Sequence, residues 1–208
     1  SLWKQRISYS ILLPIISSKD SNYTENYKVS IVPFHLEIGS FMVACHVANC
    51  VPINSLGDLK IGELLLLIIK GLDKCTCSLY NKNFSIESHV SDHQTNKLQK
   101  AITVGVGSLL KCISYNLTVI NLHLKKIIPT LLLTLLISRG AENVPCRLLT
   151  LQALTNLLRS SDDDRKRFCK IFKSKALFVL GSVVDDPSTH VRQAATQVRN
   201  MWHLLDHS

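Results

Sequence analysis

Apolar residues recur at helical spacing along most of this chain, and the pattern is clearest in its final segment. There an apolar run ends at Asp185-Asp186, Pro187 follows, and an apolar stripe begins. Its members recur every three or four residues: Val191, Ala194, Ala195, Val198, Met201, Trp202 and Leu205. This spacing places apolar side chains along one face of an α-helix. The segment therefore predicts two antiparallel helices joined by a tight turn.

The same pattern predicts helices elsewhere in the chain. They cover residues 2–18, 31–51, 59–72, 96–113, 122–138, 144–159, 167–184 and 190–205. Arg147 and Arg192 are 45 residues apart, and HEAT repeats have a period of roughly 40–47 residues. Helix pairs of this kind bury their apolar stripes only by stacking on neighbouring pairs. We therefore expect an all-α fold, a HEAT-type or armadillo-like solenoid of about four antiparallel helix pairs.

The repeats are expected to form one domain, 1–208, with an uneven internal organisation. Residues 1–73 are predicted to form irregular first repeats, and residues 96–208 the regular ones. Between them lies a long polar stretch, 74–95, which we predict to be an insertion loop because its apolar pattern is weak. The chain begins at Ser1 rather than Met, so we expect a fragment of a longer protein, its C-terminal domain.

The polar stretch also carries the residues most like metal ligands: Cys75, Cys77, His89 and His93. A structural zinc site usually pairs C-x(2–4)-C with H-x(3–5)-H. The histidines fit this spacing, but the two cysteines are too close together. The zinc signal is weak, and neither a metal nor a cofactor is predicted.

Composition and charge narrow the functional classes. Hydrophobic residues make up 46% of the chain and charged residues 19%, which is too apolar for disorder. The formal net charge of +9 suits nucleic acid or an acidic protein partner, and an unbalanced fragment would also show it.

The apolar run 127–137 is about half the ~20 residues of a membrane span, so we expect a buried helix and no membrane partner. The chain has seven cysteines. Five of them lie within or beside apolar helical stretches, which favours a reducing, intracellular compartment: Cys45, Cys50, Cys112, Cys146 and Cys169.

Catalytic motifs are absent from the sequence. It has no nucleophile elbow, no phosphate-binding glycine loop and no HExxH. The lone GxG at Gly105 and Gly107 lies inside a helical stretch and predicts close helix packing. The chain is therefore not expected to be an enzyme.

Charged residues near the last helices suggest structural and binding roles. Asp186 in the turn and Arg192 in the helix are expected to pair with each other or with an adjacent repeat, in a ladder along the stack. Trp202 is also expected to have a structural role, packing in the core beside this ladder. The charged stretch 162–167, with Lys173 and Lys175 after it, is either a solvated edge or a basic strip for an acidic protein surface.

The final segment resembles a known family. Asp185-Asp186, Val191-Arg192, Ala195, Arg199, Trp202 and Leu204-Leu205 are similar to the C-terminal end of the large HEAT-repeat scaffold subunits of the cytosolic iron–sulfur protein assembly targeting complex. This family is also named for methyl methanesulfonate sensitivity and nucleotide-excision repair. A second match is Leu2-Trp3-Lys4-Gln5-Arg6 followed by Leu12-Leu13-Pro14. The chain departs from the family at residues 187–190, 193–194 and 206.

The resemblance implies a non-catalytic scaffold in the cytoplasm and nucleus. Such a scaffold binds the small assembly-factor subunit, which holds a β-propeller subunit. Together they deliver iron–sulfur clusters to apo-proteins of DNA repair, replication and transcription. We expect the partner contacts on Arg192, Arg199 and His203, and more weakly on Lys173 and Lys175.

Other functions remain open at this stage. One is a different HEAT-repeat adaptor, either a karyopherin-like cargo carrier or a phosphatase scaffold. A cargo carrier predicts acidic inner helices, whereas this chain is basic. Another is a basic helical domain that binds nucleic acid directly, which predicts a steep salt dependence of affinity and is less favoured.

Overall fold

The computed structural model describes residues 34–52, 58–84, 92–115, 118–160 and 162–205, and within these ranges it contains helices and no strand. The α-helices are α2 (Phe34–Cys50), α3 (Asp58–Phe84), α4 (Asp92–Ser114), α5 (Leu124–Ile137), α6 (Val144–Leu158), α7 (Asp163–Val183) and α8 (Thr189–Leu204). Short 3-10 helices, η2 (Thr118–His123) and η3 (Ala141–Asn143), precede α5 and α6. The predicted all-α class is confirmed. The helix predicted over residues 2–18 lies outside the described residues.

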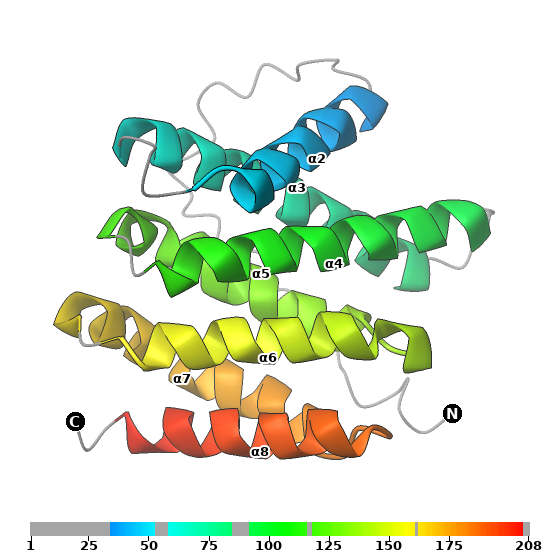
Figure 1. Ribbon diagram of the computed structural model, residues 1–208. Coiled ribbons are helices and arrows are strands. Elements are labelled where there is room, and N and C mark those ends of the chain that lie inside the picture. Colours follow the sequence, from blue (N-terminus) through cyan, green and yellow to red (C-terminus); the bar gives the residue numbers. More distant parts are fainter. Residues whose placement is uncertain (1–33, 53–57, 85–91, 116–117, 161, 206–208) are drawn as a thin grey trace.

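The helices alternate between two layers (Figure 1). One layer contains α2, α4, α6 and α8, each packed against the next; the other contains α3, α5 and α7. Contacts between the layers join α3 to α4, α5 to α6 and α7 to α8. Short connections favour this arrangement, because a helix joined to the next by a tight turn packs antiparallel beside it. Consecutive helices therefore fall into opposite layers.

The centre of the core is α5, which contacts α3, α6 and α7. Nearly every residue from Ile127 to Ile137 is buried, as the sequence predicted. The 20-residue stretch Thr118–Ile137 is long and apolar enough to cross a membrane by length and composition alone, but 67% of its most apolar window is buried inside the stack. That burial is typical of a core helix. Pro129 lies inside α5, where its lack of an N–H removes one backbone hydrogen bond of the helix.

The predicted insertion loop is wrong for most of its length. Helix α3 continues to Phe84, and α4 begins at Asp92. Leu72, Cys75 and Leu79 are buried at helical spacing, and the Thr76 hydroxyl donates a hydrogen bond to the carbonyl of Leu72 (2.8 Å). A narrow buried stripe thus anchors this part of α3 in the core. The polar residues on its other faces made the apolar pattern hard to recognise in the sequence.

The first helices approach closely around one aromatic ring. Phe41 of α2 is buried, and it lies against Gly71 of α3 and Gly105 of α4. A Cβ at either glycine would overlap the ring. The close packing predicted at Gly105 is therefore present, whereas a Cβ added at Gly107 would make only an ordinary contact, 3.9 Å from Leu149 Cδ1.

Candidate functional site

The turn before α8 contains a buried ion pair between neighbouring helix pairs. The Asp186 carboxylate lies against the guanidinium of Arg147 on α6, with Nε 2.9 Å from Oδ2 and Nη2 donating to Oδ1 at 3.1 Å. Both side chains are about 3% exposed or less. The backbone N–H of Ser188 also donates to Oδ1 (2.9 Å). A buried carboxylate needs such partners, so this pair connects α6 to the start of α8.

Arg192 is not the partner of the Asp186 carboxylate. Its guanidinium donates to the backbone carbonyls of Asp186 (2.8 Å) and Pro187 (3.0 Å), not to the Asp186 carboxylate. Arg147 does the same in the preceding helix pair, donating to the carbonyls of Ser138 (2.6 Å) and Gly140 (2.8 Å). The two arginines are therefore equivalent, and each stabilises the turn that precedes its own helix.

Trp202 packs entirely in the core, with 0% of its surface exposed. Val191, Ala195 and Val198 form the rest of the buried stripe of α8. The indole N–H of Trp202 has no hydrogen-bond partner among the described residues. Its position is that of a packing residue rather than a surface contact.

A largely exposed face of α8 differs from the equivalent face of α6. We call it the α8 end face, and it consists of Arg192, Thr196, Arg199 and His203. With the 45-residue offset, the equivalent residues of α6 are Arg147, Leu151, Leu154 and Leu158. All four α6 residues are buried, whereas Arg192 is half-buried and the other three end-face residues are exposed.

This comparison shows that equivalent sides of α6 and α8 differ in burial and in chemistry. The α6 side is buried and carries three leucines, and α6 packs against α8. On α8 the same side carries a threonine, an arginine and a histidine in place of three leucines. Burying Arg199 and His203 under another apolar helix would cost free energy unless the partner supplied opposite charge. The end face therefore suits a polar, acidic partner better than a further apolar helix.

Two lysines expected to contact a partner lie on α7. Lys173 donates a hydrogen bond from Nζ to the backbone carbonyl of His203 (2.9 Å) at the end of α8. A cation at this position is favourable for the helix dipole, so Lys173 has a structural role next to the end face. Lys175 is half-buried.

A second polar cluster was not anticipated from the sequence. The Asn121 amide donates to the Asp162 carboxylate (2.6 Å) and accepts from Nε of Arg165 (3.0 Å). Arg165 is 1% exposed. The hydrogen bond from Asn121 and those from the backbone hold the pKa of the Asp162 carboxyl below its ordinary value. Asp162 also caps α7, accepting from the N–H groups of Asp164 and Arg165, so the charged stretch 162–167 begins as a helix cap.

The weak zinc candidate is not assembled among the described residues, which contain no group of three or more potential ligands. Cys75 is buried, and burial raises the pKa of its thiol to about 11. His89 and the side chain of His93 lie outside the described residues. Cys75 and Cys77 are thus on one helix, with Cys75 part of the core.

The chain matches no family model, and no curated protein or solved structure similar to it is found. The binding chemistry of the α8 end face is therefore inferred from the charge and exposure of its own residues. Helices α6 and α8 contain no Asp or Glu, so no acidic side chain of either helix neutralises Arg199.

Proposed function

We propose that this protein is a non-catalytic scaffold, a HEAT-type solenoid whose α8 end face docks an acidic surface of a partner protein. The observation that carries the proposal is the contrast between Leu154 of α6, which is buried, and its equivalent Arg199 of α8, which is exposed. Alternation of the helices between two layers supports the solenoid. A stacked helix pair buries an apolar side, and a side that carries cations instead is available to another molecule.

The partner we propose is the small assembly-factor subunit of the cytosolic iron–sulfur targeting complex, which would connect the scaffold to a β-propeller subunit. The protein would then help to deliver iron–sulfur clusters to apo-proteins of DNA repair, replication and transcription, in the cytoplasm and nucleus. Support comes from the sequence resemblance over the last helix, whose residues include Arg192, Arg199 and Trp202. In this proposal, Arg192, Arg199 and His203 of the end face contact the partner.

A binding titration with the purified small assembly-factor subunit tests this proposal. We expect the unaltered chain to bind and Arg199→Glu to lose at least tenfold in affinity. Lys100→Glu makes the same charge change at an exposed position of α4 and should leave the affinity unchanged. Circular dichroism verifies that both variants keep their helicity. Equal affinity of the two variants would contradict the proposed location of the interface, and no binding by the folded chain would contradict the proposed partner.

A second candidate, direct binding of nucleic acid, is favoured by the absence of acidic residues from α6 and α8. Phosphate contacts would make the affinity for DNA fall steeply with salt concentration. The same titration with duplex and single-stranded DNA at two salt concentrations separates the candidates. Tight, strongly salt-dependent binding of DNA, without binding of the protein subunit, would favour this second function.

A further inference from the structure

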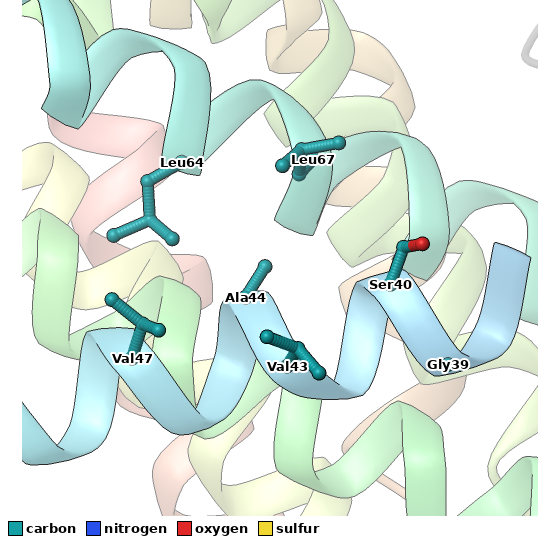
Figure 2. A pocket seen from close by; sticks show the side chains of 7 residues that line it. All are labelled: Gly39, Ser40, Val43, Ala44, Val47, Leu64 and Leu67. Carbon is teal, nitrogen blue, oxygen red and sulfur yellow. The ribbon is translucent and has the colours of Figure 1, made fainter.

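The opposite end of the stack has an open apolar groove between α2 and α3 (Figure 2). Its volume is about 510 Å³. Apart from the glycine and the serine, its lining is aliphatic: Gly39, Ser40, Val43, Ala44 and Val47 of α2, with Leu64 and Leu67 of α3. Figure 2 shows the valines and leucines of the two helices facing each other across the groove.

The groove exposes apolar surface that the rest of the stack buries. Val43 is 63% exposed and Leu67 48% exposed. A contiguous apolar hollow on a protein surface is usually covered by another segment or molecule. The groove contrasts with the α8 end face, where arginine and histidine replace leucines, so the two ends of the stack have different chemistry.

The order of the described helices indicates what kind of element could cover the groove. Helices α4, α6 and α8 each pack against the helix that precedes them in the chain, namely α3, α5 and α7. Helices of that second layer also pack on each other, α3 on α5 and α5 on α7. A partner that preceded α2 in the same way would contact α2 and α3 together. Those are the two helices that line the groove.

The chain before α2 contains a segment suited to this position. Residues 2–18 carry apolar side chains at helical spacing: Trp3, Ile7, Ile11, Leu12, Ile15 and Ile16. As a helix they would be about 25 Å long, enough to cover the stretch from Gly39 to Val47, which rises about 12 Å along α2. Residues 19–33 can span up to about 50 Å when extended, so they allow residues 2–18 to turn back onto α2.

We propose that residues 2–18 pack as a helix in the α2–α3 groove and complete the first helix pair of the stack. Their apolar stripe would cover Val43 and Leu67, as α3 covers the corresponding side of α4. This inference is independent of the partner proposed for α8, because the groove is at the other end of the molecule.

Tryptophan fluorescence of the full chain tests the proposal. The chain has two tryptophans, so Trp202→Phe leaves Trp3 as the sole reporter in the segment. We expect blue-shifted emission from Trp3 and weak quenching by acrylamide. Adding Val43→Asp or Leu67→Asp should shift the emission to the red and raise the quenching severalfold. Ile171→Asp, at a position of α7 that is 69% exposed, is the matched control and should change neither.

Two outcomes would overturn the proposal. One is a Trp3 that is fully accessible to acrylamide and insensitive to Val43→Asp in a chain with unchanged helicity. The other is protection that appears only as the concentration rises and light scattering detects dimers, which would mean that a second copy covers the groove. If Trp202→Phe lowers the helicity, hydrogen exchange of the unaltered chain decides instead. Protected amides over residues 7–16 support the proposal, and exchange at the rate of an unstructured peptide refutes it.

Discussion

The Asp186 carboxylate pairs with Arg147, 39 residues earlier, although Arg192 lies only six residues away. The nearer arginine instead donates to the backbone carbonyls of the turn. This choice of partner joins two helix pairs through one buried ion pair. This pair and three other buried features of the structure lead to four predictions about stability.

The first concerns that ion pair. Asp186→Ala should lower the free energy of unfolding by about 3–5 kcal/mol, because it leaves the buried Arg147 guanidinium without its counter-charge. Asp185→Asn, at the exposed neighbouring carboxylate, should change it by less than about 0.5 kcal/mol. Urea denaturation of both variants measures the difference. Similar midpoints for the two would contradict the structural role of the pair.

The second concerns the glycines around Phe41. Gly71→Ala and Gly105→Ala should each destabilise the fold by about 1–3 kcal/mol, since the added methyl group would overlap the ring and force the helices apart. Gly181→Ala is the control, because a Cβ there meets nothing within 4 Å. It should stabilise the chain by up to about 1 kcal/mol through helix propensity. Thermal unfolding distinguishes the opposite signs, and destabilisation by all three alanines would argue against the close approach.

The third is a loss of stability at alkaline pH. Burial raises the pKa of the Cys112 thiol to about 11 and that of Cys169 to about 12, against about 8.5 for a thiol in an unfolded chain. The unfolded chain therefore releases these protons at lower pH than the folded chain. The stabilising contribution of the buried thiols is fully present below about pH 8.5 and is lost as pH rises toward 11–12.

Measuring the free energy of unfolding between pH 8 and 11 tests this dependence. We expect it to fall with rising pH, and Cys169→Ala should make the fall less steep by up to about 1.4 kcal/mol per pH unit. Cys50→Ala, which removes an exposed thiol, is the matched control. An identical slope for Cys169→Ala and the unaltered chain would refute the assignment.

The fourth concerns Asn121, which bridges Asp162 and Arg165. Asn121→Ala removes a hydrogen bond to each and should cost about 1–3 kcal/mol. It should also raise the pKa of the Asp162 carboxyl toward its ordinary value. Since that pKa is lowered in the folded chain, the stability it contributes is present at neutral pH and lost as the pH falls below about 4.

Denaturation and an NMR titration of Asp162 measure these two effects. Asn156→Ala is the control, because Asn156 forms a hydrogen bond with the Ser114 hydroxyl (3.0 Å) at the solvent-exposed surface. It should change the stability by less than about 0.5 kcal/mol. An unchanged Asp162 pKa in Asn121→Ala would show that the amide does not hold the carboxylate ionised.

The sequence by itself determined the helical class and the approximate position of most helices. Apolar spacing is a local property, so it identifies α5, α6 and α8 to within a few residues. It failed at the end of α3, where the buried stripe of Cys75 and Leu79 is too narrow to stand out among polar neighbours. It also placed the start of α7 four residues late, because the Asp162 cap, not an apolar residue, begins that helix.

Only the tertiary structure decided which side chains meet. Whether Asp186 pairs with Arg147 or Arg192 depends on how closely α6 approaches the turn before α8, and no local spacing encodes that distance. The same holds for Asn121 and Arg165, which are 44 residues apart. The residue types of the α8 end face can be read from the sequence, but the exposure of their side chains depends on how α8 packs against α6. Helix formation depends on near neighbours in the chain, whereas burial and ion pairing depend on which helices pack together.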